Sequence, residues 1–87
     1  MSAYSVRLSA KAVDWLDGCL DAKLRRRIGA AIDALAESPR PPGCVKLAGE
    51  DNVWRVRVGN YRILYEILDG QLVVLVVRIA IRSEAYR

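Results

Sequence analysis

The sequence predicts an α+β fold with an N-terminal strand and two helices packed on one face of a twisted, mainly antiparallel β-sheet. Two observations support this prediction. Between residues 9 and 37 apolar side chains recur at the three- and four-residue spacing of helices, and from residue 53 the period changes to the two-residue alternation of strands. The order of a strand, two helices and a three-stranded meander favours both helices on the same face.

The N-terminal half is expected to form the strand and the two helices. The segment "AYSVRL", residues 3–8, alternates in polarity, and Ser9 is the expected N-cap of a first helix that weakens near Gly18. The second helix is expected over residues 22–37, with one apolar face and several arginines on the other. The prolines of "ESPRPPG" end it, because a proline disfavours helical conformation at the residue before it.

Residues 54–58 and 61–68 are expected to form a β-hairpin. The Gly59-Asn60 dipeptide between these alternating segments is a signal for a two-residue turn. Such a turn places Arg57 directly opposite Arg62. Opposed like charges weaken a sheet by up to about 1 kcal/mol. The paired arginines therefore suggest a surface on which a bound anion offsets the charge repulsion.

The last strand is expected over residues 72–82, and its register depends on the preceding turn. A two-residue turn at Asp69-Gly70 would send Arg78 to the core, where an unpaired charge costs several kcal/mol. We therefore expect a three-residue turn with Gly70 in the left-handed conformation, which shifts the register by one residue and places Arg62 opposite Val76. The helix-facing side of this strand then carries Val73, Leu75, Val77 and Ile79.

In this register one face of the sheet gathers arginines from three strands: Arg55, Arg57, Arg62, Arg78 and Arg82. Because the guanidinium fork matches the geometry of phosphate, the cluster predicts a phosphate-binding face. The alternative is an ordinary solvated face whose arginines prevent aggregation. Leu64, Val74 and Val76 are expected to be exposed among the arginines, which predicts a groove for a partner segment.

The composition limits the chemistry that the chain can perform. Its 87 residues and 53% hydrophobic content fit one globular domain, and a net charge of +4 favours polyanionic partners such as nucleic acid. Histidine is absent, which removes the usual acid–base residue and the usual zinc ligand. Cys19 and Cys44 have no metal-binding spacing and are expected to be reduced. No metal or cofactor is expected.

Neither the N-terminal segment nor the apolar runs of the sequence predict an association with a membrane. The N-terminal "MSAYSVRLSA" has no apolar signal-peptide segment, and the longest apolar run, "LVVLVV", is too short to span a bilayer. A cytoplasmic location is therefore expected.

The stretch "KLAGEDNVWRVRVGNYRILYEILDG", followed by "VVRIAIRSEAYR", resembles the RelE branch of the RelE/ParE toxins of toxin–antitoxin systems. The pattern "WRxRxGxYRxLYE" is typical of the superfamily, and the ending "RSEAYR" is typical of the RelE branch. The resemblance spans nearly the whole chain. It implies a single RelE-like toxin domain over residues 1–87.

This resemblance implies a toxin that is a metal-independent endoribonuclease. It would cut mRNA in the ribosomal A site through attack of a 2′-hydroxyl on the adjacent phosphate, and a cognate antitoxin that covers the arginine face would neutralise it. The implied catalytic residues are Arg55, Arg57, Arg62, Arg82 and Tyr86. Arg55 and Arg57 would contact the mRNA backbone, and Arg62 would stabilise the transition state. Arg82 would act on the leaving oxygen, and Tyr86 would act on the nucleophile. RNA binding is further expected at Lys46, Arg78, Arg25 and Arg26.

Two other functions are compatible with the sequence. Ile81 stands where many RelE relatives carry a histidine, which weakens an acid–base role at this position. A ParE-like inhibitor of DNA gyrase without catalysis would dispense with Arg82 and Tyr86, which the nuclease needs. A degenerate toxin would only bind its antitoxin.

Overall fold

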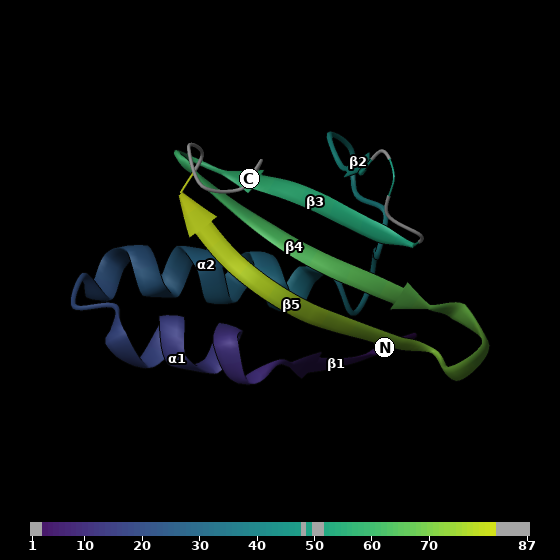
Figure 1. Cartoon of the computed structure of the whole chain (residues 1–87), viewed down its shortest axis with the longest axis horizontal. Helices are drawn as coiled ribbons and strands as arrows, with labels where there is room; N and C mark the ends of the chain where they lie inside the picture. Colours follow the sequence, from purple (N-terminus) through teal and green to yellow (C-terminus); the bar gives the residue numbers. More distant parts are fainter. Residues whose placement is uncertain (1–2, 48, 50–51, 82–87) are drawn as a thin grey trace.

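The predicted α+β architecture is confirmed by the computed structural model, which describes residues 3–47, 49 and 52–81. The described elements are β1 (Ser5–Leu8), α1 (Ala10–Gly18), α2 (Ala22–Ala34), β2 (Val45–Lys46), β3 (Val53–Val58), β4 (Tyr61–Leu68), a 3-10 turn (Asp69–Gln71) and β5 (Val73–Ile81). The strands form one mixed sheet in the order β1-β5-β4-β3-β2. The β1–β5 pair is parallel and the other three pairs are antiparallel. In Figure 1, α2 passes behind β4 and β5, with α1 beside it.

Both helices begin at the residues that cap them. Ser9 Oγ accepts a hydrogen bond from the backbone N–H of Ala12 at 3.1 Å, as predicted, and the Asp21 carboxylate caps α2 in the same way. α2 ends at Ala34, short of the predicted residue 37. The next three backbone N–H groups bond to carbonyls three residues back, which tightens the chain into turns before the prolines. Within the described part of the chain, no helix is long and apolar enough to cross a membrane.

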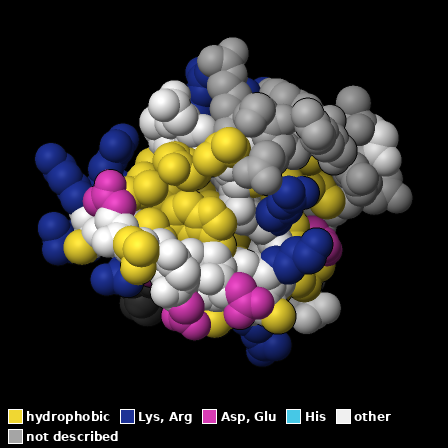
Figure 2. All heavy atoms as spheres, turned by 60° about the vertical axis from the view of Figure 1, so that its left-hand side comes forward, with side chains coloured by type: hydrophobic (Ala, Val, Ile, Leu, Met, Phe, Trp, Pro, Cys, Tyr) yellow, Lys and Arg dark blue, Asp and Glu magenta, His cyan; other side chains and the backbone are white. Residues whose placement is uncertain are grey.

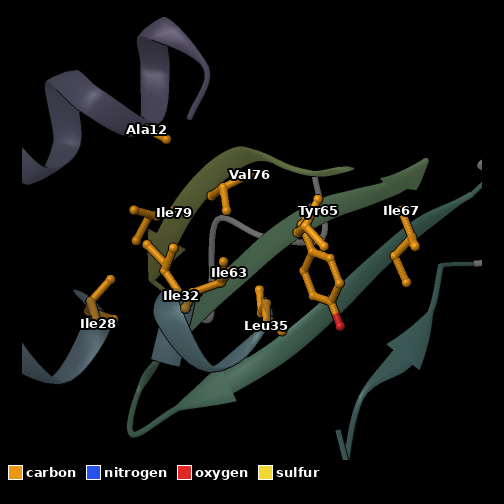
Figure 3. Close-up of a cluster of buried hydrophobic side chains, with 10 residues drawn as sticks. Ala12, Ile28, Ile32, Leu35, Ile63, Tyr65, Ile67, Val76 and Ile79 are labelled. Carbon is orange, nitrogen blue, oxygen red and sulfur yellow. The ribbon is translucent and has the colours of Figure 1, made fainter. Parts of the chain in front are cut away.

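The hydrophobic core lies between the helices and one face of the sheet. Figure 3 shows its side chains extending from α1, α2, β4 and β5 toward a common space. Tyr65 is fully buried in it, and its hydroxyl donates a 2.7 Å hydrogen bond to the carbonyl oxygen of Pro39. This bond keeps the buried phenol satisfied, and the burial raises the pKa of Tyr65. The buried cluster comprises Ala12, Ile28, Ile32, Leu35, Ile63, Tyr65, Ile67, Val74, Val76 and Ile79.

The β3–β4 hairpin has the predicted register. Gly59 and Asn60 form the turn, with φ +58 at Gly59, a conformation that glycine adopts at little cost. Val58 pairs with Tyr61, and Arg57 lies opposite Arg62. The juxtaposition of two cations on neighbouring strands is therefore a property of the fold.

The β4–β5 turn differs from the prediction. Instead of a left-handed Gly70, the segment Asp69–Gln71 forms a 3-10 turn and Leu72 takes the left-handed conformation, with φ 54. The backbone N–H of Leu72 bonds to the carbonyl oxygen of Asp69 at 3.2 Å. Leu68 therefore pairs with Val73. The prediction chose Gly70 because glycine is the residue that usually occupies this conformation.

The pairing predicted for β5 is wrong, because the longer turn shifts its register and a β-bulge then shifts it again. Tyr65 pairs with Val76 but Leu64 pairs with Arg78, so Val77 is an extra residue in β5. Val76, on the turn side of the bulge, pairs with Tyr65 and therefore faces the helices instead of the arginines. The extra residue reverses the alternation beyond it and returns Arg78 to the arginine face. Arg62 lies opposite Ala80, not Val76. The helix-facing valines of this strand are thus Val74 and Val76, in place of the predicted Val73, Leu75 and Val77.

Candidate functional site

Arg55 and Arg57 of β3 and Arg62 of β4 lie on the sheet face that is turned away from the helices. Arg57 is paired with Arg62, and Arg55 is paired with Leu64. Since directly paired residues project from the same face of a sheet, the three arginines share one face. Together they line a cleft of about 230 Å³, which is completed by Gly43 and Val45. We call this the arginine cleft.

The three arginines of the cleft differ in their access to water. The Arg62 side chain is buried, with 4% of its surface exposed, whereas Arg55 is half-buried and Arg57 is exposed. Because the attraction between opposite charges strengthens as water is excluded, an anion would be held more strongly beside Arg62 than beside Arg57. A buried cation beside a half-buried and an exposed one suits a phosphodiester whose chain continues into solvent.

Leu64, Val74 and Val76 do not form the predicted partner groove. Leu64 lies on the arginine face, as predicted, but only 8% of it is exposed. Val74 and Val76 are fully buried against the helices, because they pair with the core residues Ile67 and Tyr65. The expectation that these three side chains are exposed among the arginines is therefore wrong. An antitoxin cannot contact Val74 and Val76 without disrupting the core.

Arg78 lies on the arginine face, opposite Leu64, but it does not line the arginine cleft. It lines a separate hollow of about 440 Å³ together with Lys11, Asp14 and Trp15 of α1. The predicted RNA contact of Arg78 would thus lie beside the cleft.

Lys46 does not lie on the face of the sheet that carries the arginines of the cleft. It pairs with Trp54, whose side chain packs against the core, so Lys46 projects from the opposite face of the sheet. Its neighbour Val45 pairs with Arg55 and lines the cleft instead. The expectation for Lys46 failed because the alternation of a two-residue strand cannot be recognised in a sequence. Gly43 and Val45 were missed because they carry no chemical group that would indicate a site.

The arginines predicted on α2 lie elsewhere. Arg25 and Arg26 are exposed on α2, in the helix layer, and do not line the arginine cleft. Arg82 and Tyr86 lie outside the described residues.

A further hollow, of about 450 Å³, is largely apolar. It lies where the α1–α2 connection meets the ends of β4 and β5, and Figure 2 shows hydrophobic side chains gathered at this end of the molecule. Trp15 and Tyr61 pack there edge to face, with ring centres 5.6 Å apart, and Leu20 is 98% exposed. Because none of the described residues that line it is an arginine or lysine, this hollow suits a phosphate less well than the arginine cleft does.

A cluster of interacting side chains that the sequence did not reveal surrounds Asp69. The Asp69 carboxylate forms an ion pair with Arg40, with 2.9 Å between Oδ2 and Nη2, and accepts a 2.6 Å hydrogen bond from the hydroxyl of Tyr4. The Arg40 guanidinium also lies over the Trp54 ring, 5.1 Å from its centre. The hydrogen bonds from Arg40 and then from Tyr4 lower the pKa of Asp69, and the hydrogen bond to Asp69 raises the pKa of Tyr4.

The Asp69 cluster predicts a pH-dependent stability. Because the pKa of Asp69 is lower in the folded chain than in the unfolded chain, its contribution is complete above the ordinary aspartate pKa of about 3.9 and is lost as the pH falls through the folded value. We expect Asp69→Asn to melt below the unmodified chain at neutral pH and the difference to vanish under strongly acidic conditions. Thermal melting of both proteins across this range measures it; a difference that does not change with pH would contradict the assignment.

The comparisons with known proteins agree with this architecture. A family model described as the ParE toxin of the type II toxin–antitoxin system parDE matches residues 6–86. The chain belongs to the RelE/ParE toxin superfamily. It is a toxin of the type II toxin–antitoxin class. No curated protein sequence gives a significant match.

Solved structures similar to this RelE/ParE toxin include RelE proteins from archaea and bacteria. A chain of the archaeal RelE–RelB complex from Pyrococcus horikoshii OT3 is 26% identical with a TM-score of 0.79, covering 95% of this chain and 99% of that chain. A chain of the toxin–antitoxin complex RelBE2 from Mycobacterium tuberculosis is 26% identical with a TM-score of 0.79, covering 92% and 99%. The isolated RelE toxin of E. coli is 26% identical with a TM-score of 0.78, covering 97% and 92%.

Proposed function

We propose that this toxin is a metal-independent mRNA endonuclease that acts on the ribosome in the cytoplasm, and that the arginine cleft binds the phosphate at which the RNA is cut. The observation that supports the proposal is the convergence of Arg55, Arg57 and Arg62 on one cleft, with Arg62 buried. The likeness to RelE structures and the RelE-like ending of the sequence favour this branch of the superfamily.

In the proposed reaction the ribose 2′-oxygen attacks the adjacent phosphorus. A bond from the 2′-oxygen to phosphorus forms and the bond from phosphorus to the 5′-oxygen breaks, which leaves a cyclic phosphate and a 5′-hydroxyl. Arg62 stabilises the additional negative charge of the pentacovalent transition state, and Arg55 and Arg57 bind the neighbouring backbone. Arginine is a permanent cation and does not serve as a general base. Removal of the 2′-hydroxyl proton is therefore assigned to Tyr86. Arg82 neutralises the charge of the leaving 5′-oxygen, which takes its proton from water, and the ribosome aligns the mRNA.

Mapping mRNA 5′ ends after induction of the chain in cells tests the proposal. We expect new 5′ ends within translated codons, in frame, together with growth arrest. Growth arrest with intact mRNA, DNA damage and filamentation would contradict the proposal and indicate gyrase inhibition. Normal growth with retained antitoxin binding would contradict it and indicate a degenerate toxin.

Inhibition of DNA gyrase is the second candidate, because the matching family model describes ParE toxins. The two candidates differ in their need for the C-terminal residues. Arg82→Ala or Tyr86→Phe should remove the toxicity of a nuclease and leave that of a gyrase inhibitor unchanged.

We further propose that a cognate antitoxin covers the arginine face. The solved relatives from P. horikoshii and M. tuberculosis are toxin–antitoxin complexes. A net charge of +4 and exposed Arg57 favour an acidic antitoxin segment.

A further inference from the structure

One wall of the arginine cleft comes from a connection that has little regular structure of its own. Gly43 and Val45 line the cleft, and they belong to the segment that runs from the end of α2 to β3. Among the described residues of this segment, strand pairing is confined to β2, which contains two residues, Val45–Lys46. So short a strand supplies few backbone hydrogen bonds to fix the wall.

The connection is held at its upstream end by contacts from three other parts of the chain. The buried hydroxyl of Tyr65 bonds to the carbonyl oxygen of Pro39 at 2.7 Å. The next residue, Arg40, forms the 2.9 Å ion pair with Asp69 of the β4–β5 turn and lies over the ring of Trp54 in β3. The β4 strand, the β4–β5 turn and β3 thus hold two consecutive residues of the connection.

The distance along the chain from this fixed point to the cleft wall is short. Between Arg40 and Gly43 the backbone turns back on itself, with a 3.0 Å hydrogen bond from the N–H of Cys44 to the carbonyl of Pro41. Gly43 has φ +89, which completes this tight turn. Because only a tight turn separates them, we expect a displacement of Arg40 to move Gly43 and Val45.

We propose that Arg40 and Asp69 are positioning residues of the arginine cleft, whose ion pair holds the Gly43–Val45 wall at the spacing from the arginines that an RNA phosphodiester requires. Neither residue lines the cleft, so each acts through the connection and not by touching RNA. The inference rests on the proposed function, since it takes the ligand to be an RNA phosphate.

The substitution Asp69→Asn separates this role from simple electrostatics. It removes a negative charge, so long-range attraction alone would make a polyanion bind equally well or more tightly. Loss of the ion pair with Arg40 releases the cleft wall and would make the polyanion bind more weakly. The two effects have opposite signs. Asp33→Asn is the matched control, because Asp33 is exposed on α2 and no ion pair joins it to a described residue.

The test measures binding of a short single-stranded 2′-O-methyl oligoribonucleotide, which cannot be cut, by fluorescence anisotropy far below the melting temperature. We expect Asp69→Asn to weaken binding roughly threefold to tenfold and Asp33→Asn not to weaken it. Arg40→Lys, which keeps a cation beside Asp69 and Trp54, should retain most of the affinity. Arg40→Ala combined with Asp69→Asn should bind no more weakly than Arg40→Ala alone, because both remove one interaction.

Arg57→Ala distinguishes a failure of the positioning role from a failure of the proposed function. If Arg57→Ala weakens binding while Asp69→Asn binds as well as the unmodified chain, the positioning role is overturned and the cleft remains the RNA site. If Arg57→Ala binds unchanged, the proposed function fails with it. Should Asp69→Asn melt too low for the assay, Tyr4→Phe removes only the 2.6 Å hydrogen bond to Asp69 and should show a smaller loss of affinity in the same direction. Unchanged affinity in Tyr4→Phe and Arg40→Ala would then overturn the proposal.

Discussion

Arg62→Ala should abolish growth arrest and lower the rate of mRNA cleavage on ribosomes by about a hundredfold to a thousandfold. The reason is the position of Arg62: its side chain is buried in the arginine cleft, where its charge is least weakened by water. Removing a fixed cation of this kind leaves the charge of the transition state uncompensated. Growth of induced cells and the rate of cleavage of a programmed ribosome measure the effect.

Two further variants control this result. Arg62→Lys keeps the charge but not the planar fork, so its activity should lie between those of the unmodified chain and Arg62→Ala. Arg7→Ala removes an exposed arginine of β1 that does not line the cleft, and it should leave growth arrest intact. Circular dichroism shows whether Arg62→Ala is folded. A folded Arg62→Ala protein with full toxicity would refute the assignment of the site.

Val76→Glu should leave the chain unfolded under native conditions. Val76 is fully buried between Tyr65 and the helices, and a carboxylate placed there without a partner costs several kcal/mol. A domain of this size has a total stability of only about 5–10 kcal/mol. Val13→Glu is the matched control, because Val13 is 39% exposed on α1, and it should melt within a few degrees of the unmodified chain.

Thermal and urea unfolding of the two variants measure this difference, and they test the observed register of β5. In the register predicted from the sequence, Val76 would lie opposite Arg62 and face solvent among the arginines, and Val76→Glu would be tolerated. A cooperative, native-like melting transition in Val76→Glu would therefore contradict the observed register.

The features that the sequence predicted correctly are those with local causes. The hairpin register follows from the two turn residues Gly59 and Asn60, and the start of α1 follows from the Ser9 cap. The bulge in β5 could not be predicted in this way. Six consecutive apolar residues, 72–77, precede Arg78. The pattern is therefore the same whichever side faces the core, and an extra residue cannot be recognised in it.

The residues of the candidate site also include some that a local sequence pattern predicts and others that it does not. Arg57 and Arg62 could be placed together because one short turn joins their strands. The wall formed by Gly43 and Val45, and the ion pair of Arg40 with Asp69, join segments that are distant in the sequence. Such contacts depend on the packed structure, and nothing in the residue types at these positions indicates them.

The most direct test of the central claim is an NMR titration of the arginine Nε–H signals with the 2′-O-methyl oligoribonucleotide. If the arginine cleft binds the RNA phosphate, the signals of Arg55, Arg57 and Arg62 should shift together with one saturation midpoint, and those of Arg25 and Arg26 should shift less. Shifts confined to the α2 arginines, with the cleft signals unchanged at saturation, would contradict the account.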